Sequence, residues 1–158
     1  MKNLSLTFWG GVGTVTGANF LVSYGGKKVL VDCGMLQGTS NSDEENKKEF
    51  PYDAATIDFL FITHAHIDHV GRIPKLIKDG FRGKIISTKP TQEIVPLMFE
   101  DAINVINDTA KKKDIKPLYS KDDAERALAM WQSIEYHETI SLNERFDVMF
   151  KDAGHILG

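Results

Sequence analysis

The chain of 158 residues is 42% hydrophobic and 26% charged, which is ordinary for a soluble domain with a buried core and unlike a disordered or membrane-spanning chain. Its net charge of −3 does not mark a nucleic-acid binder, but a bound metal would add positive charge, so nucleic acid is not excluded as a partner. The single cysteine, Cys33, rules out an intrachain disulfide, and the first residues lack a signal peptide, so we expect a cytoplasmic protein without membrane contact.

The first part of the chain predicts three strands. Residues 4–9 alternate like a strand with one buried face, and the glycine-rich loop that follows does not have the spacing of a nucleotide-binding fingerprint. Residues 19–24 and 27–32 flank Gly25-Gly26, which is a strong signal for a two-residue hairpin. The second strand of this hairpin therefore ends at Asp32. We expect Cys33, which comes next, to be a small buried hydrophobe.

Residues 34–56 form a polar segment with little periodicity. The segment predicts a long loop, and a loop of this length inside one domain is usually functional or mobile. It would lie near the group of polar residues described next, so contact with a substrate is one interpretation. A solvated loop is the preferred one.

An apolar run at residues 57–62 has the length and the β-branched and aromatic content of a buried strand. Directly after it come His64, His66, Asp68 and His69, at the strand end where binding crevices form in open α/β sheets. Neutral imidazoles and carboxylates are ligands for borderline divalent metals such as zinc. We expect His64 and His66 to converge on one ion, and Asp68 and His69 to reach a second. The alternative, a polar loop with solvated histidines, would place three of the five histidines of the chain here by chance.

Helices and strands alternate in the rest of the chain. Residues 73–80 predict a helix that begins near the histidines, so that its N-terminal dipole would favour an anionic ligand there. Ser120 and Asp123 form a capping-box pattern that opens a helix, and the apolar face of this helix includes Trp131. His137 is interpreted as a surface residue of a strand and not as a ligand. The other predicted elements are strands at residues 84–88, 133–138 and 145–151 and a long amphipathic helix at residues 91–112, with the last strand leading to His155.

The spacing His-x-His-x-Asp-His, which starts at His64, resembles the second motif of the metallo-β-lactamase superfamily. Residues 31–34 resemble the first motif, and residues 153–158 resemble the third, which supplies His155. Three further stretches are similar to the β-CASP branch of this superfamily, which contains RNA-processing nucleases. These stretches are residues 13–18, 32–38 and 69–74, and the resemblance covers the chain from residue 4 to residue 158.

The resemblance implies an α/β fold that corresponds to the N-terminal portion of the metallo-β-lactamase αβ/βα sandwich. It also implies a two-metal site, with zinc as the expected ion and manganese as the alternative. His64, His66 and His155 would hold the first metal, and Asp68 and His69 would contribute to the second. Asp68 would also act in catalysis by holding the nucleophile. Asp32 would lie behind the ligands and orient their loop through hydrogen bonds.

In this family two ligands of the second metal, a bridging aspartate and a further histidine, come from beyond the third motif. Residues 1–158 therefore correspond to the N-terminal part of a metallo-β-lactamase-like domain, with the β-CASP insertion and the C-terminal half absent from this chain. The implied function is hydrolysis of RNA phosphodiester bonds by a metal-activated hydroxide, with residues 1–158 inactive alone. RNA is the expected partner, no membrane is expected, and a homo-oligomer is left open.

Two other functions stay open from the sequence. One is a different hydrolase of the superfamily that acts on a thioester or a lactone, and residues 13–18 and 36–38 argue against it. The other is a non-catalytic partner subunit of an RNA-processing complex, which the complete second motif disfavours. Within the nuclease interpretation, endonuclease and 5′-exonuclease action are both compatible with these motifs.

Overall fold

The computed structural model describes residues 3–158 and contains two sheets. The large sheet has six strands in the order of the chain, antiparallel from the first to the third and parallel from the third to the sixth. The second sheet is a hairpin of two antiparallel strands. The strands of the large sheet are β1 (Ser5–Gly10), β2 (Asn19–Tyr24), β3 (Lys27–Val31), β4 (Phe59–Phe61), β5 (Lys84–Thr88) and β6 (Trp131–Ile134), and those of the hairpin are β7 (Thr139–Asn143) and β8 (Phe146–Met149).

The hairpin predicted around Gly25-Gly26 is confirmed. Tyr24 pairs with Lys27 across the turn, and both glycines have the positive φ angles, 61° and 83°, that a tight hairpin turn of this kind requires. β3 ends at Val31, so Asp32 directly follows the carboxyl end of the strand, one residue beyond the observed strand but at the expected position.

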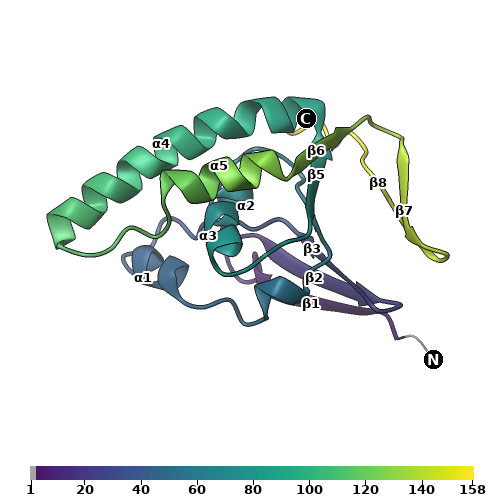
Figure 1. The fold of residues 1–158 in the computed structure, drawn as a ribbon, viewed down its shortest axis with the longest axis horizontal. Coiled ribbons are helices and arrows are strands. Elements are labelled where there is room, and N and C mark those ends of the chain that lie inside the picture. Colours follow the sequence, from purple (N-terminus) through teal and green to yellow (C-terminus); the bar gives the residue numbers. More distant parts are fainter. Residues whose placement is uncertain (1–2) are drawn as a thin grey trace.

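Helices cover one face of the large sheet (Figure 1). Leu30, Leu60 and Ile85 lie side by side on β3, β4 and β5, and all three are fully buried on that face. They pack in one cluster with residues of the helices that include Leu76 and Phe99. The helices are α1 (Ser42–Lys47), α2 (Ile67–Val70), α3 (Ile73–Lys78), α4 (Lys89–Lys113) and α5 (Lys121–Ala129), with a 3-10 turn η1 at Ala54–Thr56.

The hairpin β7–β8 covers part of the opposite face (Figure 1). Because successive side chains of a strand point to opposite faces, Phe61 and Val29 point away from the helices, and they pack against Leu142 of the hairpin. The molecule therefore has three layers: helices, the large sheet and a short hairpin. The helices against the large sheet agree with the predicted α/β class, but the hairpin that covers the other face was not predicted.

The long helix and the capping box are confirmed. α4 extends the predicted helix by two residues at its start and one at its end, with Pro96 inside it. At the start of α5 the Ser120 hydroxyl accepts a hydrogen bond from the amide of Asp123, whose carboxylate accepts one from the amide of Ser120. Among the described residues no helix is long and apolar enough to cross a membrane.

The prediction for the region after α5 is wrong in two respects. Trp131 is buried in the core but begins β6, where it pairs with Ile85 of β5, and its indole nitrogen donates to the hydroxyl of Ser87. The predicted strand at 145–151 corresponds to β8, which is shorter, whereas the predicted strand at 133–138 overlaps β6 only at its start, and β7 was not predicted. His137 is exposed, as predicted, but it lies in a turn with a φ angle of 65° and not in a strand.

The segment 34–56 is not a plain loop. It contains α1, and this helix is fixed by Asn46, whose side chain accepts from the amide of Leu36 and donates to the carbonyl of the same residue. Asn46 is 5% exposed. Since polar side chains and not an apolar face hold α1 in place, the periodicity of the sequence does not reveal the helix.

Part of the hairpin-facing side of the sheet is uncovered at the edge strand β1. Leu6 and Phe8 are 53% and 54% exposed, and they lie opposite Val22 and Phe20 on β2. An edge strand with exposed apolar side chains favours pairing with another copy. We therefore expect purified residues 1–158 to self-associate with rising concentration in sedimentation experiments. Threonine at positions 6 and 8 should weaken this association, and a strictly monomeric parent chain would contradict the prediction.

Candidate metal centre

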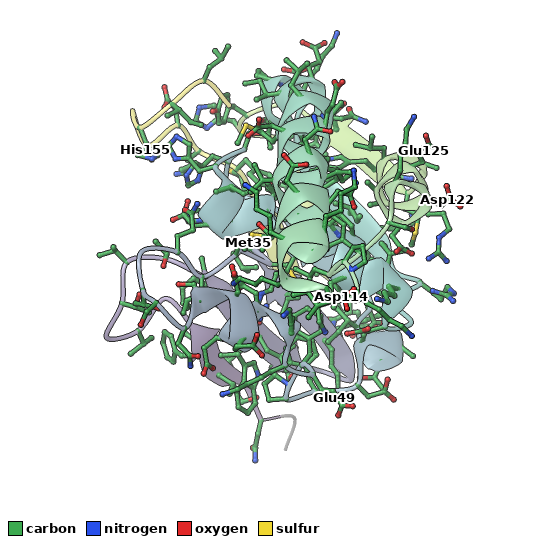
Figure 2. The ribbon with its side chains drawn as sticks, turned by 90° about the vertical axis from the view of Figure 1, so that its left-hand side faces the viewer. Met35, Glu49, Asp114, Asp122, Glu125 and His155 are labelled. Carbon is green, nitrogen blue, oxygen red and sulfur yellow. The ribbon has the colours of Figure 1, made fainter. Side chains whose placement is uncertain are left out.

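Three histidines from two distant segments meet at one point. His64 and His66 follow β4, while His155 lies on the loop after β8, and its position on that loop is visible in Figure 2. The Nε2 atom of His64 lies 3.0 Å from Nδ1 of His66, and Nε2 of His155 lies 3.3 Å from that same Nδ1. One ring nitrogen from each of the three residues lies within 4.8 Å of the other two.

Two of the nitrogen–nitrogen distances in this group, 3.0 and 3.3 Å, suit a divalent metal such as zinc. Zinc–nitrogen bonds of 2.0–2.1 Å in tetrahedral geometry place two ligand nitrogens about 3.3 Å apart. The three rings meet edge to face, with interplanar angles of 78°, 89° and 81°, so they do not stack against one another. The donor set, three imidazoles, is one that zinc and related divalent metals prefer. The residues present therefore fit a metal ion.

The protonation state of His64 also suits a ligand. Partial burial and, after it, the neighbouring His69, His66 and His155 lower the pKa of His64 to about 4. The imidazole is therefore neutral at neutral pH, and neutral imidazole is the form that binds metal.

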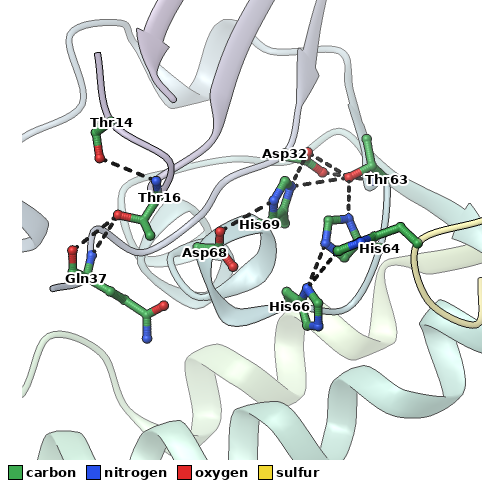
Figure 3. A network of polar contacts seen from close by, with 10 residues as sticks. Thr14, Thr16, Asp32, Gln37, Thr63, His64, His66, Asp68 and His69 are labelled. Carbon is green, nitrogen blue, oxygen red and sulfur yellow. Dashed lines mark hydrogen bonds and ion pairs between the residues drawn. The ribbon is translucent and has the colours of Figure 1, made fainter. Parts of the chain in front are cut away.

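Asp68 and His69 lie on the short helix α2 beside this group (Figure 3). Nε2 of His69 is 3.6 Å from a carboxylate oxygen of Asp68, and the His69 ring lies 4.0 Å from the ring of His64, centroid to centroid. These two residues thus form a pair of possible metal ligands next to the three histidines. Among residues 3–158, His64, His66 and His155 make up the one group of three or more that could hold a metal.

Asp32 lies behind both groups and is 1% exposed. One of its carboxylate oxygens accepts a hydrogen bond from the amide of Thr63, and the other lies 2.8 Å from the Thr63 hydroxyl and 2.7 Å from Nδ1 of His69. Burial alone would lower the pKa of His69, but the contact with Asp32 more than offsets it, so this pKa is raised. Asp32 thus contacts Thr63, which precedes His64, as well as His69, and its expected orienting role stays a prediction.

Backbone hydrogen bonds fix α2 against the loop that follows β3. The carbonyl oxygens of Ile67, Asp68 and His69 accept from the amides of Met35, Ala18 and Cys33 at 3.1, 2.9 and 2.8 Å, respectively. Gly34 lies within this contact, and a Cβ atom there would be 1.5 Å from the carbonyl oxygen of Asp68. Sequence reasoning identified this stretch by resemblance but missed its role, because the role depends on a contact between distant segments.

Cys33 is fully buried beside this contact, as predicted. Burial raises the pKa of its thiol to about 12, so it stays protonated and acts as a small hydrophobe rather than as a ligand.

Two of the stretches that resemble the β-CASP branch touch each other. The amide of Gln37 donates to the hydroxyl of Thr16, which in turn donates to the carbonyl of Gln37 (Figure 3). The glycine-rich loop after β1 and the loop after β3 are therefore joined to each other, and the amide of Ala18, just after the first loop, donates to the carbonyl of Asp68.

The predicted extent of the helix that follows the histidines is also corrected. The predicted helix at 73–80 is α3, which ends at Lys78, and a separate helix, α2, lies at the histidines. α2 has only four residues, and the anion-favouring role expected of the helix dipole stays a prediction.

Comparison with known proteins identifies the family. Residues 12–127, most of the chain, match the family described as Metallo-beta-lactamase superfamily. The chain belongs to the metallo-β-lactamase superfamily. Its predicted α/β fold, the N-terminal part of the metallo-β-lactamase fold, is likewise confirmed. MEM-A1, a subclass B3 metallo-β-lactamase from a soil metagenome library, matches with a TM-score of 0.50 and 12% identity over 89% of this chain and 47% of that chain.

Similar proteins indicate the branch of the superfamily to which this chain is related. Ribonuclease TTHA0252 of Thermus thermophilus is 36% identical over 150 residues, which are 95% of this chain and 32% of the relative. Transcription termination factor FttA of Cenarchaeum symbiosum is 34% identical over 160 residues, covering 99% of this chain and 24% of the relative. The chain therefore spans about a quarter to a third of the length of these curated relatives. The predicted kinship with the N-terminal part of β-CASP RNA nucleases is confirmed.

Proposed function

We propose that the protein is a metal-dependent nuclease that hydrolyses RNA phosphodiester bonds. The observation that carries this proposal is the meeting of His64, His66 and His155. Asp68 lies near His66 and His69 in Figure 3. The relative named a ribonuclease supports RNA as the substrate. We further propose zinc as the metal, with manganese as the alternative, and a cytoplasmic location.

In this proposal each residue has a separate task. His64, His66 and His155 hold one divalent metal, and Asp68 and His69 contribute to a second position. A metal bound there would supply a nucleophile at neutral pH by lowering the pKa of water and would stabilise charge on the phosphate. The Asp68 carboxylate accepts a hydrogen bond from the attacking water and so orients it toward phosphorus. Asp32 fixes the His69 ring through Nδ1.

We propose that residues 1–158 are the N-terminal part of the catalytic domain and do not complete the site alone. Among the residues that the structure describes, His64, His66 and His155 make up the one group of three or more that could hold a metal. In this proposal Asp68 and His69 would supply only two ligands to the second position. The remaining ligands, the acid for the leaving oxygen and the β-CASP insertion would come from outside this segment. The match to the ribonuclease of Thermus thermophilus supports this proposal, because it covers 95% of this chain but only 32% of the ribonuclease.

An RNA-cleavage assay tests the proposal. We expect the protein at its natural length to cleave labelled single-stranded RNA when zinc or manganese is present and to stop when a chelator removes the metal. Residues 1–158 alone should leave the RNA intact. Hydrolysis of a thioester or lactone with no cleavage of RNA would replace the nuclease proposal, and no hydrolysis of any of them would favour a non-catalytic subunit.

A further inference from the structure

We propose that Thr63 is a positioning residue whose hydroxyl connects the buried Asp32 carboxylate to His64 and so sets the tautomer of His64. In that tautomer Nδ1 carries the proton and Nε2 is free to face the metal. The inference rests on the proposed metal centre for its purpose. The hydrogen-bond pattern from which it is drawn does not depend on any metal.

Thr63 makes short contacts with Asp32 and His64. Its hydroxyl oxygen lies 2.8 Å from a carboxylate oxygen of Asp32 and 2.9 Å from Nδ1 of His64 (Figure 3). Its amide donates to the other carboxylate oxygen of Asp32 at 2.8 Å. Thr63 is thus attached to Asp32 at two points, and the position of its hydroxyl is fixed relative to the His64 ring.

The number of hydrogens decides the direction of each bond. A carboxylate only accepts hydrogen bonds, and a hydroxyl has a single hydrogen to donate. If the Thr63 hydrogen pointed to His64, an oxygen lone pair would face the Asp32 carboxylate at 2.8 Å, which is repulsive. The hydroxyl therefore donates to Asp32 and accepts from His64, and His64 must carry its proton on Nδ1.

The result is a free nitrogen where the metal centre needs one. A neutral imidazole has one N–H group, so protonation of Nδ1 leaves a lone pair on Nε2. Nε2 of His64 is the atom that lies 3.0 Å from Nδ1 of His66 in the group of three. In metal sites the hydrogen bond made by one ring nitrogen commonly determines which nitrogen binds the metal.

The same carboxylate acts directly on His69. Its 2.7 Å contact with Nδ1 of His69 is shorter than the 3.3 Å contact of the Thr63 hydroxyl with that atom, so the His69 proton is directed to Asp32. Nε2 of His69 is then left free beside Asp68. One buried carboxylate thus determines the tautomers of two histidines: that of His69 directly and that of His64 through Thr63.

Nitrogen-15 NMR of histidine-labelled, metal-free protein tests the inference without any metal or activity. We expect the His64 ring, assigned with a His64→Gln variant, to be protonated on Nδ1 in the parent protein and in Thr63→Ser. In Thr63→Val, which keeps the shape but removes the hydroxyl, the Nε2-protonated form should appear. A parent protein with His64 protonated on Nε2 would overturn the inference, whatever the variants do.

Zinc affinity, measured by competition with a chelator, provides the second readout. Thr63→Val should bind zinc about 10–100-fold more weakly, as when other hydrogen-bond partners of ligands are removed, and Thr63→Ser should restore the affinity. Thr16→Val is the matched control, since the Thr16 hydroxyl contacts Gln37, and it should bind like the parent. Equal affinity of Thr63→Val and parent would overturn the inference. A parent protein that shows the expected tautomer but binds no metal would support the hydrogen-bond connection from Asp32 through Thr63 to His64, and it would contradict the proposed function.

Discussion

Replacing Asp68 with asparagine in the natural-length protein should lower the rate of RNA cleavage by at least about 100-fold, the loss typical of one preorganised electrostatic contact in an active site. Asparagine has the same shape but carries no charge, so it holds the attacking water poorly. The fold should not change, because the contact of residue 68 with the Ala18 amide is made by its backbone carbonyl and not by its side chain. Single-turnover cleavage of labelled RNA measures the rate.

The matched control for this change is Asp43→Asn. Asp43 is an acidic residue of α1 whose carboxylate pairs with Lys113, and it does not contact any of the histidines. Its replacement removes one negative charge in the same way and should leave the cleavage rate within a factor of about 2, as expected for an exposed ion pair. A rate for Asp68→Asn that matches this control would contradict the role proposed for Asp68.

Replacing Gly34 with alanine should cost more than about 3 kcal/mol of unfolding free energy, above the usual range for overpacking, because backbone atoms and not flexible side chains are in the way. The added Cβ would lie 1.5 Å from the carbonyl oxygen of Asp68 and 2.7 Å from the amide nitrogen of His69. Either α2 or the loop after β3 must move, and both carry residues of the metal centre. Denaturant unfolding of the chain measures the loss.

Gly26→Ala separates this steric effect from the general cost of losing a glycine. Gly26 has a φ angle of 83° and has no atom within 4 Å of an added Cβ. Alanine there should cost only the about 1–2 kcal/mol of a left-handed backbone conformation. Equal losses for the two variants would mean that the Gly34 contact is not tight.

The elements that the sequence predicts correctly are those with local signals. The turn at Gly25-Gly26 needs two positive φ angles, the capping box of Ser120 and Asp123 closes within four residues, and β5 falls at the predicted residues 84–88. Spacing alone also indicated that His64 and His66 lie close together. His155, on a separate segment, was assigned to the same group by resemblance.

The features that the sequence does not reveal depend on contacts between distant segments. α1 is held by Asn46 on the backbone of Leu36, and Trp131 joins a strand because β5 offers it a partner. Thr63 looks like an ordinary polar residue until Asp32 is placed beside it. No periodicity or spacing encodes such pairs, because each partner gains its role from the position of the other.

The metal content of purified residues 1–158 tests the central claim most directly. After removal of loosely bound ions, we predict about one equivalent of divalent metal per chain, since three histidines converge at one position and two donors at the other. His66→Ala should abolish tight binding, while His137→Ala, at an exposed turn outside the centre, should leave it unchanged. Two equivalents of tightly bound metal on a single chain would contradict this account. So would one equivalent that stays tightly bound in the His66→Ala variant.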